Sequence, residues 1–295
     1  MINCPTVAVL LAAYNGKEFI SEQVDSIFNQ TGVEIQLYIS VDLSTDGTYE
    51  WCKQLETGYH NVTVLGYGEK FGGAAKNFFR LIKEVDFSSF DYVALSDQDD
   101  IWLPNKLTHA VKLILIKKLD GFSSDVVAFW EGGRERLLKK SYHQKKFDYI
   151  FESGGAGCTY VFKSDALCVF RKHLLSNWEQ VVSTGSGQHD WLIYAFFRSK
   201  QFRWLIDDKP LMLYRQHNSN QVGFNSGLKS YLKRILMVRS NWYRTEVEKK
   251  FELYPPSDSV KFSLNHWFLV KNIWQLRRRP RDVFVLFIMI VIGFF

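Results

Sequence analysis

Cysteine and proline are scarce in this sequence, with 4 and 6 occurrences among 295 residues. The cysteines are Cys4, Cys52, Cys158 and Cys168, and no two of them form a Cys-x-x-Cys pair. This spacing argues against a disulfide-stapled scaffold, a zinc ribbon and a thioredoxin-type redox site. We therefore expect free thiols and a protein that works in a reducing cytosol.

Signatures of phosphate binding and of secretion are missing as well. No Gly-x-Gly-x-x-Gly follows the first apolar run and no P-loop motif occurs, which argues against a Rossmann dinucleotide site and a P-loop nucleotidase. The N-terminal apolar run has no basic segment before it and no cleavage site after it, so we expect no signal peptide. A nucleotide phosphate would have to be held by another device.

What is present describes a large globular protein. Hydrophobic residues make up 46% of the chain, charged residues 23% and aromatic residues 16%. These proportions exclude a disordered, collagen-like or coiled-coil chain. A chain of this length buries a sizeable core without covalent staples.

The positive charge is concentrated near the C-terminus. Residues 228–281 hold 13 Lys and Arg against 4 Asp and Glu, a net charge of +9 in a chain of +6, so the rest carries −3. Apolar residues at helical spacing predict a basic amphipathic helix over residues 227–244, and a second basic run, Arg277–Arg281, follows. Val283–Phe295 is then thirteen residues without a charge.

This C-terminal region predicts contact with a membrane surface. A spanning helix needs about 20 apolar residues, so the last segment is too short to cross a bilayer but long enough to lie in one leaflet below arginines that meet anionic headgroups. A solvated basic face with a buried C-terminal helix is the alternative. We expect no nucleic-acid binding, because no recognised module accompanies the basic residues.

The first hundred residues alternate short β-branched runs with amphipathic helical patterns. We expect strands over 6–13, 34–41, 61–65 and 91–96, separated by helices over 17–29, 46–55 and 73–85. The run Val7–Leu11 is apolar at every position, as a strand covered on both faces requires. The chain is therefore predicted to form an α/β fold with a parallel sheet flanked by helices, in which ligands bind beyond the carboxyl ends of the strands.

Acidic residues gather after the fourth predicted strand. The segment Asp97-Gln-Asp-Asp100 places three carboxylates within four residues, and their mutual repulsion is relieved by water or by a hard divalent cation. The segment predicts a site for a metal and a diphosphate. A helix cap or solvated turn before Pro104 is the alternative interpretation.

Five motifs together resemble the family 2 glycosyltransferases of GT-A fold, and within them the bacterial rhamnosyltransferase-like enzymes of O-antigen and capsule assembly. The resemblance covers about residues 5–225. Its motifs are Leu11-Ala-Ala-Tyr-Asn-Gly16, Ser44-Thr-Asp-Gly-Thr48, Leu95-Ser-Asp-Gln-Asp-Asp-Ile-Trp102, Gln188-His-Asp-Trp191 and Tyr214-Arg-Gln-His-Asn-Ser-Asn-Gln221. It implies a GT-A domain over residues 1–225, and the basic and apolar pattern described above predicts a helical, membrane-associating region over residues 226–295.

The resemblance also implies roles for individual residues. The donor nucleotide sugar would be bound by residues of the loops after the strands and of the later Arg-Gln-His segment, namely Ala13, Tyr14, Asn15, Asp42, Lys70, Gly72, Asp97, Gln98 and Arg215. Asp99 and His217 would hold a divalent metal, Mg²⁺ or Mn²⁺, and Asp190 would act as the catalytic base. From the residues alone, His217 is as well explained as a turn histidine and Asp190 as an acid at a helix N-terminus.

Two departures from the family pattern bear on specificity. The second loop has Val41 and Leu43 on either side of Asp42, where the family commonly has paired acids, which leaves the base contact open. Gly154-Gly-Ala-Gly157 occupies the segment that lines the acceptor site in the family, and it is explained equally by a close approach to a sugar and by a turn.

The implied activity is an inverting, metal-dependent transfer of a sugar, with L-rhamnose from dTDP-L-rhamnose as the first expectation. The acceptor would be a lipid-linked oligosaccharide at the cytoplasmic face of the bacterial inner membrane. A transferase that uses another nucleotide sugar, and a non-catalytic nucleotide- or polysaccharide-binding module, are the alternatives.

Overall fold

The computed structural model describes residues 4–184, 188–217, 241–256 and 264–295. Within them all four cysteines are free thiols, as expected. The expected alternation of strands and helices in the first hundred residues is confirmed, with ends that differ by a few residues. The elements are β1 (Thr6–Ala13), α1 (Ile20–Phe28), β2 (Glu34–Val41), α2 (Thr48–Gly58), β3 (Val62–Val64), α3 (Ala74–Glu84) and β4 (Tyr92–Asp97).

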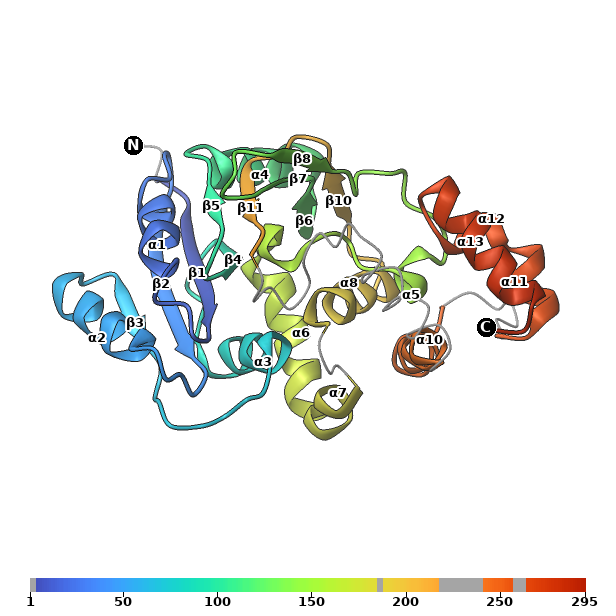
Figure 1. The fold of residues 1–295 in the computed structure, drawn as a ribbon, viewed down its shortest axis with the longest axis horizontal. Helices are drawn as coiled ribbons and strands as arrows, with labels where there is room; N and C mark the ends of the chain where they lie inside the picture. The colour runs from blue at the N-terminus through green and yellow to red at the C-terminus, as the bar shows by residue number, and fades with distance from the viewer. Residues whose placement is uncertain (1–3, 185–187, 218–240, 257–263) are drawn as a thin grey trace.

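A seven-stranded sheet runs through the middle of the molecule in the order β10-β6-β9-β4-β1-β2-β3 (Figure 1). The later strands are β6 (Gly121–Ser124), β9 (Val161–Lys163) and β10 (Trp204–Asp207). All neighbours pair in parallel except β9, which is antiparallel to both β4 and β6. The expected mostly parallel sheet is therefore confirmed, and its carboxyl ends lie at one edge.

Both faces of this sheet are covered, which explains the unbroken apolar run of β1. Ala8, Leu10 and Ala12 belong to one apolar cluster, while Val7, Val9 and Leu11 belong to a second on the opposite face. The first cluster contains side chains of α3, α6 (Ser164–Ser176) and α8 (His189–Ser199); the second contains those of α1 and α4 (Lys106–Lys117). Successive side chains of a strand point to opposite faces, so a doubly covered strand has no polar side.

A second, four-stranded sheet has the order β5-β11-β7-β8. Its strands are β5 (Ile101–Trp102), β7 (Val126–Phe129), β8 (Glu135–Leu138) and β11 (Met212–Arg215). The antiparallel pairing of β11 with β5 sets Met212 opposite Trp102, so the residues after β11 lie close to the acidic segment before β5. This small sheet joins two motifs that are more than a hundred residues apart in the chain.

The C-terminal region is helical, as expected, and packs onto the rest of the chain. It comprises α10 (Trp242–Leu253), α11 (His266–Lys271), α12 (Ile273–Leu276) and α13 (Pro280–Val291), which lie beside the short helix α5 (Asp148–Phe151) (Figure 1). Val283, Leu286 and Ile290 of α13 are buried in the same apolar cluster as α3 and α8. Most of the basic helix predicted over 227–244, and the domain boundary predicted at 225, lie outside the described residues.

One side of α13 stays exposed. Nine of the 17 exposed large apolar side chains found in the described residues fall between positions 267 and 294, most of them on α13 and just after it. No helix in the described ranges combines the length and apolar character needed to cross a bilayer.

Candidate active site

A cavity of about 1110 Å³ opens at the carboxyl ends of β1, β2 and β4 and extends as far as α13. Nine of the twelve predicted site residues line it: Ala13, Tyr14, Asn15, Asp42, Asp97, Gln98, Asp99, Asp190 and His217. Lys70, Gly72 and Arg215 are not among the described residues of its lining. Four of the five motifs thus contribute to the lining, as the topology of the sheet predicts, and the remaining motif, Ser44–Thr48, is joined to it by the hydrogen bond from the Asn15 N–H to Ser44 Oγ.

The loop after β1 is held by the side chain of Gln98. The Tyr14 N–H donates to Gln98 Oε1 at 2.7 Å, and Gln98 Nε2 donates to the Tyr14 carbonyl at 2.9 Å. The amide lies so close over Gly16 that a Cβ there would stand 2.0 Å from Oε1. Gln98 is predicted to contact the donor, and its hydrogen bonds position the loop that carries Tyr14.

Asn15 connects this loop to the one after β2. Its backbone adopts a positive φ of 44°, its N–H donates to Ser44 Oγ at 3.0 Å, and its Oδ1 accepts from the Thr45 N–H at 2.8 Å. Asparagine tolerates this left-handed conformation better than most residues. Tyr14, next to it, is 47% exposed and presents its ring to the cavity.

Asp42 is buried and organises the loop that follows β3. Its carboxylate accepts from the N–H groups of Phe71 at 2.8 Å and Gly72 at 3.0 Å. Gly72 thus contributes a backbone donor to Asp42, with a positive φ of 77° that favours glycine. Lys70 is exposed in this loop, and its predicted contact with the donor stays a prediction.

The acidic segment after β4 has a buried inner part. Burial and the charge of Asp99 raise the pKa of Asp97 to about 7, and the same causes raise the pKa of Asp100 well above its ordinary value. Neither Asp100 Oδ2 nor Nζ of the buried Lys106 has a hydrogen-bond partner among the described residues. Burial lowers the pKa of Lys106 to about 7, so this lysine does not compensate the carboxylates fully at neutral pH, and a bound cation would relieve the repulsion among them.

Two sets of side chains could hold that cation. Asp97, Asp100 and Cys158 bring their ligand atoms within 4.8 Å of one another, but burial raises the pKa of the Cys158 thiol well above its usual range, and a protonated thiol is a poor ligand. Asp99 and His217 face the cavity, with Asp99 Oδ2 2.8 Å from His217 Nε2. Asp97 does not bring a carboxylate oxygen within 4.8 Å of both ligand atoms of that pair. Asp99 and His217 face the open cavity, where a donor diphosphate could share a bound Mg²⁺ or Mn²⁺, so this pair stays the predicted metal site.

Arg215 helps to position Asp99 and His217. Its Nε donates to the Asp99 carbonyl at 2.9 Å, and its guanidinium pairs with Glu22 and stacks over the rings of Phe19 and Phe129. The Phe19 ring also contacts the His217 ring, with centroids 4.7 Å apart. Arg215 is predicted to bind the donor, and its contacts hold Asp99 directly and His217 through the Phe19 ring.

Asp190 lies in the first turn of α8 and lines the cavity. Its Oδ1 accepts from the Trp191 N–H at 2.8 Å, and its backbone carbonyl accepts from the Tyr160 hydroxyl at 3.2 Å. A Cβ on Gly157 would stand 2.4 Å from His189 Nε2 and 3.3 Å from the Asp190 Cβ. Gly157 thus permits a close approach of the start of α8, and Gly154 permits that of the Tyr194 ring on the same helix.

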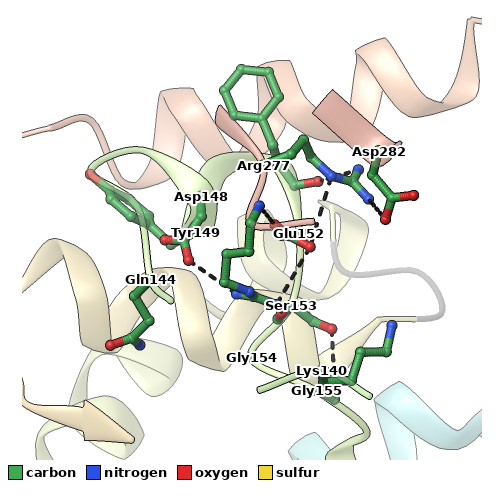
Figure 2. Close-up of polar contacts among 12 residues, drawn as sticks. Lys140, Gln144, Asp148, Tyr149, Glu152, Ser153, Gly154, Gly155, Arg277 and Asp282 are labelled. Carbon is green, nitrogen blue, oxygen red and sulfur yellow. Dashed lines mark hydrogen bonds and ion pairs between the residues drawn. The ribbon is translucent and has the colours of Figure 1, made fainter. Parts of the chain in front are cut away.

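The far end of the cavity is lined by cations that the sequence did not assign to the site. They are Arg136, Lys139, Lys140, Arg277, Arg279 and Arg281. Figure 2 shows the ion pairs of Arg277 with Glu152 and Asp282, at 3.8 and 3.5 Å. The run Arg277–Arg281 was predicted to meet a membrane; the structure buries Arg278 in ion pairs with Asp148 and Glu152 and turns Arg279 and Arg281 toward the cavity. No sequence pattern singles out Lys140, because the residues on either side of it in the chain show no helix or strand periodicity.

Comparison with known proteins gives a consistent result. The profile of "Glycosyl transferase family 2" matches residues 8–178. The chain is 40% identical over 291 residues, 97% of its length and 100% of the relative's, to "dTDP-rhamnosyl transferase RfbG" of Shigella flexneri. It is 28% identical over 161 residues, 52% of its length and 57% of the relative's, to "UDP-Glc:alpha-D-GlcNAc-diphosphoundecaprenol beta-1,3-glucosyltransferase WfgD" of Escherichia coli.

A solved structure supports the fold. The mannosyltransferase PcManGT of Pyrobaculum calidifontis, determined with GDP-Man and Mn²⁺, matches with a TM-score of 0.53 and 14% identity, over 99% of this chain and 86% of that one. At this identity the match carries the fold alone.

Proposed function

This chain belongs to glycosyl transferase family 2 and is a glycosyltransferase of GT-A fold, and on that basis we propose that it moves L-rhamnose from dTDP-L-rhamnose to a lipid-linked saccharide. The observation that carries the proposal is the 40% identity to a dTDP-rhamnosyl transferase over 97% of the chain. The cavity supports it by bringing Asp99 and His217, the proposed metal ligands, and Asp190, the proposed base, into the same space.

We assign the nucleotide to the end of the cavity formed by the loops after β1 and β2. Ala13, Tyr14 and Asn15 would contact the base and ribose, and Asp97 the ribose, on a frame fixed by Gln98. Asp42 is bonded to the backbone of Phe71 and Gly72, so it sets the shape of the base pocket through that loop. The same loop would bring Lys70 toward the donor.

Asp99 and His217 would hold the divalent metal, with Asp97 beside them. A bound Mg²⁺ or Mn²⁺ supplies positive charge for the diphosphate that leaves. The protein's own contribution is to hold the two ligands 2.8 Å apart and to keep them oriented through Arg215, which contacts the Asp99 carbonyl and the ring of Phe19. Without a cation, the carboxylates of this end would repel a nucleoside diphosphate.

Asp190 is the proposed general base. As the acceptor oxygen bonds to the anomeric carbon, its proton passes to the Asp190 carboxylate, and the bond from that carbon to the diphosphate oxygen breaks with the electron pair leaving on the nucleoside diphosphate. One displacement inverts the anomeric centre, so a β-linked dTDP-L-rhamnose gives an α-rhamnoside.

We further propose that residues 226–295 hold the catalytic part, residues 1–225, at the cytoplasmic face of the bacterial inner membrane. Two observations support this proposal. One side of α13 is apolar and exposed, next to basic residues, and the name of the Escherichia coli relative includes a lipid diphosphate. An amphipathic surface of this kind binds at the headgroup boundary without spanning.

The test is a calorimetric titration of the full chain with dTDP, UDP and GDP, each with Mn²⁺ and with EDTA. We expect dTDP to bind most tightly and only with the metal. Preference for UDP or GDP would replace the rhamnosyl donor by another nucleotide sugar. If no nucleotide binds, the transferase proposal is wrong and a polysaccharide-binding module takes its place.

A further inference from the structure

Two cations that line the cavity near α13 have no pairing partner among the described residues. The side chains of Lys140 and Arg279 both line the cavity, and neither has a hydrogen-bond or ion-pair partner in the part of the chain that the structure describes. Their neighbours differ: Arg277 is tied to Glu152, Asp282 and the Tyr243 hydroxyl, and Arg278 to Asp148 and Glu152. The charges of Lys140 and Arg279 are thus available to a ligand.

An apolar track begins beside these cations. Val285, Leu286 and Met289 of α13 line the cavity beyond Arg279 and Arg281, at the three- and four-residue spacing of one helix face. The track continues outward onto exposed side chains of the same helix, including Ile288 and Ile292. A ligand bound here would contact the two positive charges at one end and apolar side chains of α13 at the other.

Lys140 also lies within electrostatic range of the catalytic carboxylate. Burial lowers the pKa of Lys140, and the charges of Glu152, Arg277, Arg278 and Asp190 all act on it. Lys140 and Asp190 also line the same cavity, so a group bound at Lys140 shares that space with the proposed base. Figure 2 shows Lys140 with the Glu152 and Arg277 network that borders it.

We infer that Lys140 and Arg279 bind the diphosphate of an isoprenyl diphosphate acceptor, whose hydrocarbon chain leaves the cavity along Val285 and Met289 of α13. The inference rests on the proposed function, since it locates the acceptor of that reaction. The phosphate oxygens receive charge-assisted hydrogen bonds from the ammonium and the guanidinium. No metal is needed at this end, because the side chains supply the positive charge.

The experiment is a calorimetric titration of the full chain, in neutral detergent micelles with EDTA, with farnesyl diphosphate. Chelation removes the metal on which diphosphate binding at the Asp99 end depends. We expect Lys140→Gln and Arg279→Gln each to raise the Kd about tenfold, the loss of one charge-assisted contact. Lys112→Gln and Arg203→Gln remove exposed charges outside the cavity lining and should change the Kd by less than about twofold.

Three further arms decide between explanations. Farnesol, which lacks the diphosphate, should bind the wild type and both variants equally, and dTDP with Mn²⁺ should bind all of them alike. Unchanged farnesyl diphosphate binding in the variants overturns the inference. So does competition by phosphatidylglycerol as strong as by the diphosphate, because the site would then serve membrane headgroups.

Failure of the proposed function looks different. Wild type that binds no nucleotide with Mn²⁺ refutes the transferase, whatever farnesyl diphosphate does. Variants that lose dTDP binding along with farnesyl diphosphate would overturn a role confined to the acceptor.

Discussion

The two ends of the cavity have opposite chemistry. At the carboxyl ends of β1, β2 and β4 the cavity is lined by Asp42, Asp97 and Asp99, whereas near α13 it is lined by Lys140, Arg279 and apolar side chains. Both substrates of the proposed reaction contain a diphosphate. The acidic end can accept one only through a cation, while the basic end can accept one directly.

This difference explains how one cavity keeps two diphosphates apart. Without a metal, the acidic end repels the donor and the basic end remains usable by the acceptor. With a metal at Asp99 and His217, the proposed donor would be drawn to that end, and the proposed base Asp190 lines the same cavity. Substitutions that remove charge at one end should therefore leave binding at the other end unchanged.

The largest effect is expected at Asp190, where the ends meet. Asp190→Asn removes the base but keeps an oxygen that accepts the Trp191 N–H, so turnover should fall about 10³-fold while the Kd for dTDP with Mn²⁺ stays the same. Single-turnover kinetics with dTDP-L-rhamnose measures this. Asp165→Asn is the control, because Asp165 also lies in a first helical turn and bonds the next N–H, but is exposed. Turnover within about tenfold of wild type would contradict the assignment.

The next effect concerns the acidic end alone. Asp99→Asn should weaken dTDP binding in Mn²⁺ at least about tenfold, since it removes one of two proposed metal ligands. In EDTA the same change should leave dTDP binding equal or slightly tighter, because one repelling charge is gone. Asp208→Asn, an exposed acid outside the cavity lining, should change neither. Equal loss with and without metal would mean that Asp99 acts on the fold and not through a cation.

The sequence anticipated the acidic end better than the basic end. The regular alternation over residues 6–97 places four polar loops at one sheet edge, and the structure confirms that edge and brings nine predicted residues to it. The second sheet was not predicted, because its strands are two to four residues long and show no period. Its pairing nevertheless decides that His217 reaches Asp99.

The hydrogen bonds among the site residues could not be predicted from the sequence either. Gln98 and Arg215 belong to matching motifs and Gly72 to the loop after β3, yet their hydrogen bonds go to Tyr14, Asp99 and Asp42. A motif gives the position of a side chain in the chain but not its rotamer. Lys140 and Arg279 were missed because the cavity wall they form requires α13 to fold back on the first half of the chain.

A smaller effect is expected from adding a methyl group at Gly157, which packs against the start of α8. In Gly157→Ala the new Cβ would stand 2.4 Å from His189 Nε2, which is too close, so the start of α8 must move. We expect a loss of about 1–3 kcal/mol in the free energy of unfolding and a drop in turnover. Urea unfolding measures the first. Gly58→Ala, at a position with nothing within 4 Å, is the control, and equal stability of the two variants would contradict the packing argument.

The smallest effect tests the charge at the start of α8. Burial lowers the pKa of His189 to about 4, and only Asp190 opposes the shift, so the imidazole is neutral when folded at pH 7. An unfolded histidine takes up its proton near pH 6.5, so as the pH falls from 7 to 5 the unfolded state gains protons first and the folded state loses stability.

The glutamine in His189→Gln takes up no proton in the unfolded state. Between pH 7 and 5 the free energy of unfolding of the wild type should therefore fall by about 1–2 kcal/mol relative to that of the variant. Urea titrations at both pH values measure the difference, and His60→Gln, an exposed histidine, should show almost none of it. A neutral neighbour leaves Asp190 free to accept a proton from the acceptor. If the wild type instead gained stability relative to His189→Gln on acidification, a charged imidazole would sit beside Asp190, and the start of α8 would share the chemistry of the basic end.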